Sequence, residues 1–561
     1  MSSLMSLITE GWWWTMGVTL VVGLVSLLWM LYWKPRLEAK PPVPCVPMLP
    51  NSHWLLGHLL WLLEKEYLEK QRALAEFADE HGRCACWIGP TQRSLSLTSA
   101  SDALVLLRNH HTRHSAPLLQ HHFEMLSGKR NLLLLNGKEW RCYQTALKSA
   151  LLQQWKDDPL HLQRIVLATT QTLVSNIHQT IRQQQSSGSS NTSMMMHCPS
   201  IDGYMKMITQ DVFGLAAFSH DFGCCSSLEL SNFAKAFEAV EDDILDRCLH
   251  NALLPQNMWY RIPTQRNRNF LHHRAYLRNF LSDIVRERLT KTQDAKGKSD
   301  ILDKLLERHT EKQSSAHGDK DANFLVEQED LVDILLSVLL AGYDTVSISL
   351  TYAVYLVSKY PEWQELCLEE IRQTTPSGIG KGQIRYPLCR AVIVEALRLY
   401  PVATALSRTL EKPFTLPKGN VTVPKGCHVG ISVWLIHRSE HHFPQPLEFR
   451  PDRWVERNEQ GKWVERISTS TTLGDNDDAN SIPAGNKDAF FAFSAGARSC
   501  PGQSFALEEA SLAFAVLLRG LKFDVDPDYE AGMEWKVIVQ KPKGGVPATI
   551  SMRNETTERT K

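Results

Sequence analysis

The sequence has no excess of charge of either sign. Its 61 lysines and arginines are matched by 61 aspartates and glutamates, so the formal net charge is zero. Proteins that bind nucleic acid hold the phosphates with a basic surface, and this composition gives no electrostatic support for such a surface. We therefore expect no nucleic-acid partner.

Cysteine is present, but not at the density of a disulfide-stabilised protein. Twelve cysteines are spread over 561 residues, and close pairs occur only at Cys84/Cys86 and Cys224/Cys225. Small secreted proteins place their cysteines far more densely. The pair at Cys84 also lacks a second pair at zinc-site spacing. We expect mostly free core thiols in a reducing compartment.

Only one long uncharged apolar run occurs, residues 12–33, "WWWTMGVTLVVGLVSLLWMLYW". It exceeds the roughly 20 residues that span a bilayer, and its aromatic ends suit the two membrane interfaces. The basic residues Lys34, Arg36 and Lys40 follow, which places the rest of the chain in the cytosol. A cleaved signal peptide fits less well because no basic residue precedes the run. We expect a membrane anchor over 1–34, with a buried core helix as the alternative.

The rest of the chain is expected to be mainly helical with a small β portion. Prolines over 35–58 indicate a stiff extended tether. Apolar periodicity predicts helices over 62–81, 101–109, 138–155, 160–182, 203–218, 229–250, 266–292, 327–358, 361–374, 388–399 and 503–519. The runs "CACWIG" and "SLSLTS" bracket "PTQR" as a hairpin would, and strand-like runs return near 414–434.

Polar segments interrupt this pattern without an internal repeat. Residues 182–193 are of low complexity, and 456–487 are rich in Gly, Asn, Asp, Ser and Thr. Both are expected to be loops without secondary structure, the second as a surface insertion. We predict one large domain over 59–552 and a polar tail over 553–561.

The segment "FAFSAGARSCPGQ" holds the strongest motif. Its spacing is F-x-x-G-x-R-x-C-x-G, with the specified residues Phe493, Gly496, Arg498, Cys500 and Gly502. Five specified positions match by chance about once per million registers at average composition. The motif resembles the haem-binding loop of the cytochrome P450 superfamily, in which the cysteine is the axial thiolate ligand of haem iron. The alternative is a buried cysteine beside a turn.

The chemistry of the segment suits that role. Glycines let a backbone approach a flat cofactor closely. Pro501 is expected to open the following helix at its first turn, so that the positive end of the helix favours a Cys500 thiolate. Arg498 is a candidate partner for a haem propionate, and Phe493 is expected to shield the sulfur from water.

Two further segments carry the same resemblance. In "LLAGYDTVS", Ala341, Gly342, Asp344 and Thr345 match the family's A-G-x-D-T segment. The resemblance implies that Gly342 opens a groove in the helix, that Thr345 donates a hydrogen bond and that Asp344 supplies protons during oxygen activation. The alternative for so short a motif is a helix glycine beside an incidental Asp-Thr pair.

The segment "EALR" places Glu395 and Arg398 among apolar neighbours, where an ion pair needs further partners to offset desolvation. By resemblance the third member is Arg453 in "FRPDRW", and the triad is structural. Haem propionates are expected near Trp140 and Arg408. At the position where the family commonly has a second arginine, this chain has Gln144, for which Arg141 or Lys148 are candidate substitutes.

The resemblance covers about residues 41–552 and implies the cytochrome P450 fold, preceded by one transmembrane helix. It implies non-covalent haem b and insertion of one oxygen atom from O2 into a hydrophobic small molecule such as a fatty acid, sterol, terpenoid or xenobiotic. Roughly 60 residues follow Cys500, too few for a flavin domain, so electrons from NADPH are expected through a separate cytochrome P450 reductase, with cytochrome b5 as an additional candidate.

The implied location is the endoplasmic reticulum membrane, with membrane lipid as a partner and the catalytic domain facing the cytosol. Substrate choice is expected to depend on loop 113–135, the 229–270 region and helix 327–358. Two rival functions remain: a haem-thiolate isomerase or lyase that needs no reductase, and a haem or gas sensor. The intact Asp344-Thr345 pair favours oxygen activation over both.

Overall fold

The computed structural model describes most of the chain. The described residues are 22–24, 26–27, 46–49, 67–88, 92–110, 112, 117–186, 195–250, 260–291, 300–306, 328–374, 384–466, 487–536 and 539–553. The expected anchor over 1–34 and tether over 35–58 lie outside them, apart from the three short stretches before residue 50. The tail after Arg553 and residues 467–486 of the expected insertion also lie outside.

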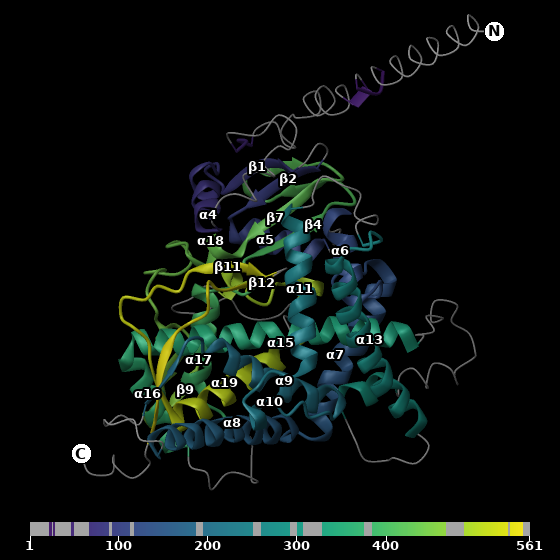
Figure 1. Ribbon diagram of the computed structural model, residues 1–561. Coiled ribbons are helices and arrows are strands. Elements are labelled where there is room, and N and C mark those ends of the chain that lie inside the picture. The colour runs from purple at the N-terminus through teal and green to yellow at the C-terminus, as the bar shows by residue number, and fades with distance from the viewer. Residues whose placement is uncertain are drawn as a thin grey trace, which may run out of the picture. The chain divides into compact units, whose positions relative to one another are not determined.

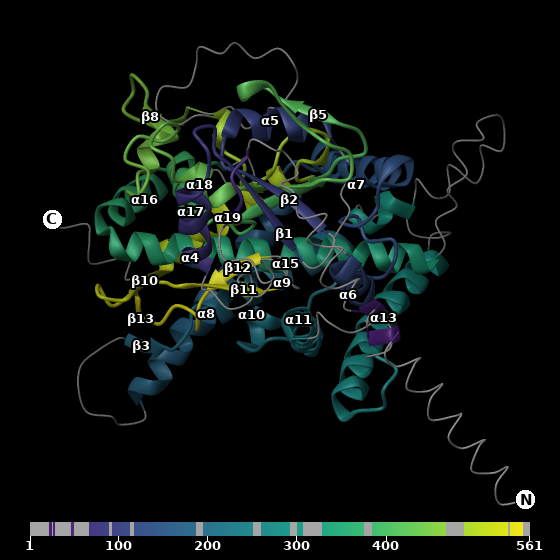
Figure 2. The same ribbon diagram turned by 90° about the horizontal axis from the view of Figure 1, so that it is seen from above.

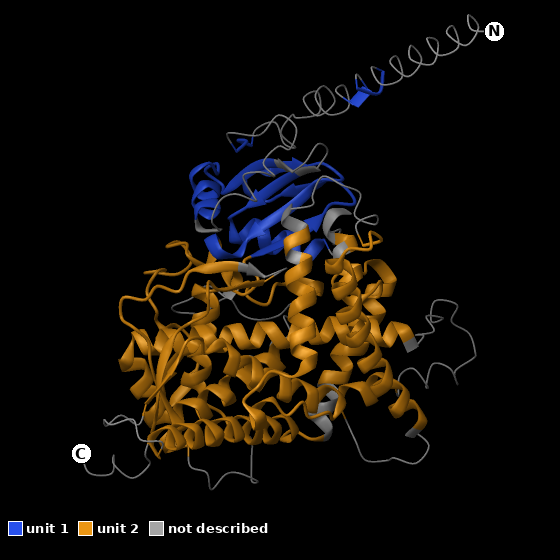
Figure 3. Ribbon diagram, in the orientation of Figure 1, with its two compact units in different colours: residues 1–110, 405–435 blue, residues 111–404, 436–561 orange. Residues whose placement is uncertain are grey.

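The chain divides into two compact units, coloured separately in Figure 3. Unit 1 comprises residues 1–110 and 405–435, and unit 2 comprises residues 111–404 and 436–561. Unit 1 carries the four-stranded sheet, and unit 2 carries most of the helices (Figure 1).

The sheet of unit 1 has the strand order β1-β2-β7-β4. The strands of this sheet are β1 Arg83–Ile88, β2 Gln92–Leu97, β7 His428–Ser432 and β4 Ala405–Thr409. Unit 1 also contains the helices α4 Tyr67–Glu76 and α5 Ala100–Asn109. It further contains the hairpin of β5 Phe414–Leu416 and β6 Val421–Val423. The expected hairpin is present, since β1 and β2 pair antiparallel with Arg83 opposite Leu97. β2 pairs parallel with β7, which joins two segments far apart in sequence into one sheet.

Unit 2 is a helical body with small sheets at its edge. Its helices are α6 Pro117–Ser127, α7 Gly137–Asp157, α8 His161–Ser186, α9 Asp202–Phe218, α10 Cys224–Ser227, α11 Asn232–His250, α13 Gln265–Lys291, α15 Gln328–Lys359, α16 Pro361–Gln373, α17 Pro387–Leu399 and α19 Gln503–Gly520, and α18 Val433–His437 ends in it. Its strands are β3 Met195–Cys198, β8 Val455–Arg457, β9 Trp463–Glu465, β10 Leu521–Asp524, β11 Met533–Lys536, β12 Val539–Pro542 and β13 Ala548–Met552.

Helix α15 is the central helix of unit 2. It packs against α9, α13, α17 and α19, and it runs through the middle of that unit in Figures 1 and 2. Among the described residues it supplies the one helix that is long and apolar enough to cross a membrane, Glu329–Lys359. Because 78% of its most apolar window is buried within the protein, α15 is a core helix.

The structure corrects the expected loops. Residues 113–135 contain helix α6, which begins with Pro117 at its first turn and buries Phe123 and Leu126 on one face. Residues 182–186 continue α8, because arginine and glutamine are good helix formers even without an apolar face. Residues 455–465 form the hairpin β8–β9, in which Gly461 supplies the left-handed turn conformation at φ +73°.

The start of α19 also differs from the sequence prediction. The helix begins at Gln503, and Gly502 is its N-cap residue with φ −95°. Pro501 therefore lies in the turn before the helix and does not occupy its first turn. The N-terminus of α19 still follows Cys500 directly, so the positive end of the helix dipole lies beside the cysteine.

Glu509 on α19 is a buried carboxyl group, and within the described residues neither of its oxygens has a hydrogen-bond partner. Burial raises its pKa well above the ordinary 4.5. The folded protein then binds the proton more tightly than the unfolded chain, so stability falls as pH rises from about 4.5 towards the folded-state pKa. Glu509→Gln should remove this loss, with a relative gain of about 1.4 kcal/mol per pH unit in that window.

Thermal unfolding followed by circular dichroism from about pH 5 to pH 8 measures this slope. Glu508→Gln is the matched control on the same helix, because the Glu508 carboxylate accepts a hydrogen bond from Gln163 Nε2 at 2.7 Å. A difference between wild type and Glu509→Gln that stays constant with pH would contradict the prediction.

Candidate active site

Backbone hydrogen bonds within the loop that carries Cys500 hold its conformation. The Cys500 amide donates to the Phe493 carbonyl at 2.9 Å, and the Ser494 amide donates to Phe491 O at 2.9 Å. Ser494 and Gly496 take the left-handed conformation, at φ +63° and +69°. Gly496 meets this requirement without steric cost, which gives the motif glycine a conformational reason.

The Cys500 thiol is accessible and yet desolvated. Among the ten free cysteines of the described residues it is the one with an exposed side chain. Enough protein surrounds the sulfur for desolvation to raise its pKa, while the Gly502 amide and the positive charge of Lys148 act to lower it. The net shift of the pKa is upward, and an accessible sulfur with a cation and a backbone donor nearby can act as a metal ligand once it is deprotonated.

Gly502 leaves space beside the same loop. Nothing in the described residues lies within 4 Å of a Cβ added there, and its φ is open to any residue. No contact within the described chain therefore demands a glycine at this position. A requirement for close approach by a flat group beside the loop would explain it, and the loop fits a haem in this respect.

Arg498 connects the Cys500 loop to the start of α7. Its Nη2 donates to Leu135 O at 2.5 Å and to Asn136 Oδ1 at 2.7 Å. Its Cζ lies 4.1 Å from the centroid of the Trp140 ring, a cation–π contact. The structure thus brings together Arg498 and Trp140, which sequence analysis had assigned separately to the propionates. Asn136 was missed, because a lone asparagine in a loop has no distinguishing pattern.

Gln144 also contacts the Cys500 loop. Its Nε2 donates to the Ala497 carbonyl at 2.7 Å. Gln144, which stands where the family of the sequence resemblance commonly has an arginine, thus holds the backbone of the Cys500 loop in this chain. Lys148, one helical turn further along α7, is the cation that acts on Cys500.

On α15, the residues of the A-G-x-D-T segment face in different directions. Ala341 is exposed and Thr345 is half-buried, and the Thr345 hydroxyl donates to Ala341 O at 2.6 Å. The Asp344 side chain is buried. A Cβ on Gly342 would lie 2.7 Å from the Phe213 ring, so close packing of α15 on α9 also requires this glycine.

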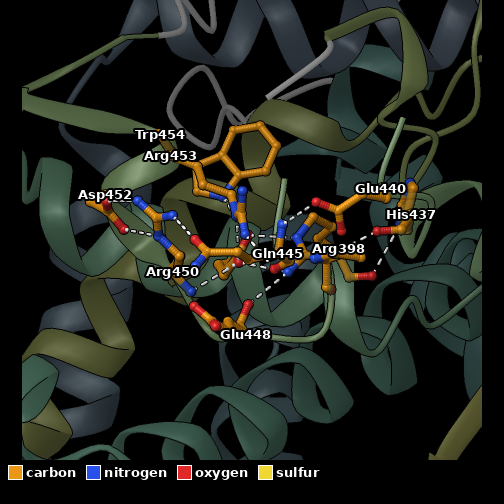
Figure 4. A network of polar contacts seen from close by, with 11 residues as sticks. Arg398, His437, Glu440, Gln445, Glu448, Arg450, Asp452, Arg453 and Trp454 are labelled. Carbon is orange, nitrogen blue, oxygen red and sulfur yellow. Dashed lines mark hydrogen bonds and ion pairs between the residues drawn. The ribbon is translucent and has the colours of Figure 1, made fainter. Parts of the chain in front are cut away.

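Glu395, Arg398 and Arg453 meet in one buried network. Figure 4 labels Arg398 and Arg453 among the neighbours of this network. Arg398 binds Glu395 through two nitrogens, Nε at 2.9 Å and Nη2 at 2.8 Å. Arg453 Nε lies 3.3 Å from the same carboxylate. The carboxylate also accepts from Trp454 Nε1 at 2.8 Å and from the Arg450 amide at 3.0 Å, so its burial is fully compensated.

The remaining two predicted residues are placed as follows. Arg408 lies on β4 in unit 1, where its Nε donates to His110 O at 3.0 Å and its Nη1 to Ser407 O at 2.7 Å. Phe493 is half-buried in the loop of unit 2. The haem contacts assigned to these two residues stay predictions.

Comparison with known proteins identifies a family. A family model described as cytochrome P450 matches residues 47–547. Human cytochrome P450 4X1 is 25% identical over 540 residues, covering 94% of each chain. Human cytochrome P450 4Z1 is 24% identical over 516 residues, covering 89% of each chain.

Two further similarities extend the comparison. Secologanin synthase 1 of Catharanthus roseus is 27% identical over 331 residues, which cover 58% of this chain and 56% of that relative. The crystal structure of the cytochrome P450DA heme domain aligns with a TM-score of 0.68 at 18% identity. It covers 91% of this chain and 98% of that chain, a likeness that shows the fold.

Proposed function

The chain belongs to the cytochrome P450 family of monooxygenases, and on that premise we propose that it inserts one oxygen atom from O2 into a hydrophobic small molecule. The observation that carries the proposal is the Cys500 thiol. It is accessible and lies within a loop of the family's spacing, and the Gly502 amide and the charge of Lys148 oppose the desolvation that raises its pKa.

Bound haem b would supply the oxygen-activating chemistry, and the Cys500 thiolate would hold its iron. The chain's own residues would bind and orient it. Arg498 and Arg408 carry charges that match carboxylates, and the Trp140 ring, which packs under the Arg498 guanidinium, fixes where that charge lies. Gln144 holds the loop in place through the Ala497 carbonyl, which is a different task from pairing with a carboxylate.

On α15 the proposed proton-handling groups are Asp344 and Thr345. The Thr345 hydroxyl donates to Ala341 O, and its lone pairs remain able to accept a hydrogen bond. Asp344 is the preceding residue, and its carboxyl group is buried. The two side chains leave α15 in different directions, and we propose that each handles protons separately during oxygen activation.

The electron source, location and substrate class belong to the same proposal. We infer electrons from NADPH through a separate flavoprotein reductase, with cytochrome b5 as an additional candidate, and a site on the cytosolic face of the endoplasmic reticulum membrane. The apolar segments "PLLQHHFEML" and "NLLLLNG" support a hydrophobic substrate. The name of secologanin synthase 1 shows that a relative makes a small organic product.

A difference spectrum of the reduced, CO-treated protein tests the proposal. Thiolate ligation is expected to shift the Soret band to the red end of the family's range, and a histidine-type spectrum in well-folded protein would overturn it. Incorporation of isotopically labelled O2 that requires NADPH and reductase would establish the monooxygenase. Rearrangement of an organic peroxide without either would favour the isomerase or lyase instead.

Thr345→Ala should uncouple the reaction. NADPH is expected to be consumed at a similar rate while product per NADPH falls by about 10-fold or more and hydrogen peroxide rises, because positioned proton transfer contributes at least that much. Thr345→Ser keeps the hydroxyl and should retain coupling. Ser349→Ala is the control, since Ser349 makes the same kind of hydrogen bond one turn later, to Thr345 O at 2.7 Å. Equal coupling in Thr345→Ala and Ser349→Ala would exclude this role.

A further inference from the structure

His437 is a buried residue outside every motif considered so far, and it contacts two of them. It ends α18 and is 0% exposed. Its Nδ1 lies 3.2 Å from Arg398 O, and its own carbonyl accepts from Arg398 Nη1 at 2.8 Å. On the other side of the ring, Nε2 accepts from the Phe491 amide at 2.8 Å. One imidazole therefore links α17 to the segment that leads to Cys500.

These partners determine the protonation state of the ring. The Phe491 amide is a donor, so Nε2 must offer its lone pair. Arg398 O is an acceptor, so Nδ1 must carry the proton. Burial, together with the nearby positive charge of Arg398, lowers the pKa of His437 to about 3. The ring is thus a neutral imidazole of one defined tautomer.

The contact continues along the backbone to Cys500. The Phe491 amide is fixed by His437, and the Phe491 carbonyl in turn accepts from the Ser494 amide at 2.9 Å. Phe493, the residue directly before Ser494, accepts a hydrogen bond through its carbonyl from the Cys500 amide at 2.9 Å. Three successive hydrogen bonds therefore connect the His437 ring to the amide of Cys500.

Aromatic packing reinforces the same connection. The His437 ring stacks on Phe490, with centroids 5.2 Å apart and an interplanar angle of 6°. Phe490 also packs on Trp454, whose indole nitrogen donates to Glu395. Both the ring face and the ring nitrogens of His437 thus join the buried network of Figure 4 to the residues that begin the Cys500 loop.

We propose that His437 is a positioning residue that holds the Cys500 loop at a fixed distance from α17 and so sets the position of the thiolate that binds the metal. The inference rests on the proposed function, because it assumes that Cys500 is the ligand. The network of Glu395 and Arg398 fixes the backbone of α17. Through its two ring nitrogens, His437 then fixes the Cys500 loop relative to α17.

Three substitutions separate the hydrogen bonds of the ring. His437→Gln places an amide oxygen near the position of Nε2 and can still accept from Phe491. His437→Asn is one methylene shorter, so it can reach Arg398 O but not the Phe491 amide. His437→Phe keeps the stack on Phe490 and removes both hydrogen bonds.

The readouts are the thiolate band of the reduced CO complex, its rate of conversion to the form without thiolate ligation, and the reduction potential. His437→Gln is expected to resemble wild type. His437→Asn and His437→Phe should convert about 10-fold faster, the factor for losing one buried hydrogen bond, and shift the potential. Wild-type behaviour of His437→Asn, or equal failure of His437→Gln and His437→Phe, would overturn the proposal.

A measurement that does not use the haem spectrum distinguishes failure of this inference from failure of the proposed function. Amide hydrogen exchange of the peptide 487–500 reports the Phe491 hydrogen bond directly. His437→Asn should exchange about 10-fold faster there, with exchange in α17 unchanged. If wild type lacks the thiolate band, the proposed function fails, yet the exchange result still decides whether His437 holds the loop. Faster exchange spread evenly over unit 2 would mean a general packing role and overturn the inference.

Discussion

Cys500→Ala should abolish both the thiolate band of the reduced CO complex and all NADPH-driven turnover. Loss of a residue that only supports a metal ligand costs about 10–100-fold, and loss of the ligand itself should cost more. Alanine keeps the backbone hydrogen bond from residue 500 to Phe493 O, so the loop can retain its fold. The effect therefore isolates the sulfur.

Cys142→Ala is the matched control for this experiment. Cys142 lies on α7 and, apart from Cys500, is the one free cysteine of the described residues that is not buried. Its replacement should leave the spectrum and turnover within experimental error of wild type. A thiolate band that survives in Cys500→Ala and disappears in Cys142→Ala would move the ligand to α7 and contradict the assignment.

Local patterns explain why much of the fold could be predicted from the sequence. The hairpin β1–β2 follows from period-two alternation around a turn, and α15 and α19 follow from apolar periodicity. The Cys500 motif specifies five positions within ten residues, so one loop is enough to suggest the family. Each of these signals lies within one short continuous stretch of the sequence.

The contacts that complete the site are of a different kind. Gln144 reaches a carbonyl 353 positions away, and His437 reaches an amide 54 positions away. Their partners are backbone groups, which every residue possesses, so the sequence at the partner position carries no sign of the contact. Gln144 appeared in the sequence as a departure from the family pattern, and its role became visible only with Ala497 beside it.

Helix α6 was missed for a related reason. Its two histidines, His121 and His122, interrupt an otherwise apolar run, and the preceding segment is rich in polar residues. Tertiary packing of Phe123 and Leu126 decides the helix, and a weak local pattern does not forecast that packing. The same applies to the hairpin β8–β9, whose polar composition suggested a loop.

Arg398→Lys should prevent accumulation of folded, haem-containing protein. Arg398 is fully buried and uses its fork for two hydrogen bonds to Glu395 and three to the carbonyls of His437, Pro446 and Glu448. Lysine has three donors on a single atom and cannot reach all of these acceptors. The Glu395 carboxylate would lose its bidentate partner, and breaking a buried ion pair costs about 3–5 kcal/mol, a large part of a typical stability of about 5–15 kcal/mol.

Arg450→Lys tests whether this cost belongs to Arg398 or to any arginine of the network. The Arg450 side chain is half-buried and pairs with Asp452 at 2.8 Å, while its backbone amide, which a lysine keeps, donates to Glu395. A solvent-accessible pair of this kind contributes about 1 kcal/mol or less, so Arg450→Lys should yield haem protein at nearly the wild-type level. Haem content and thermal unfolding of the two variants, measured side by side, decide the question. If Arg398→Lys matches Arg450→Lys in both, the buried network does not stabilise the haem-binding core.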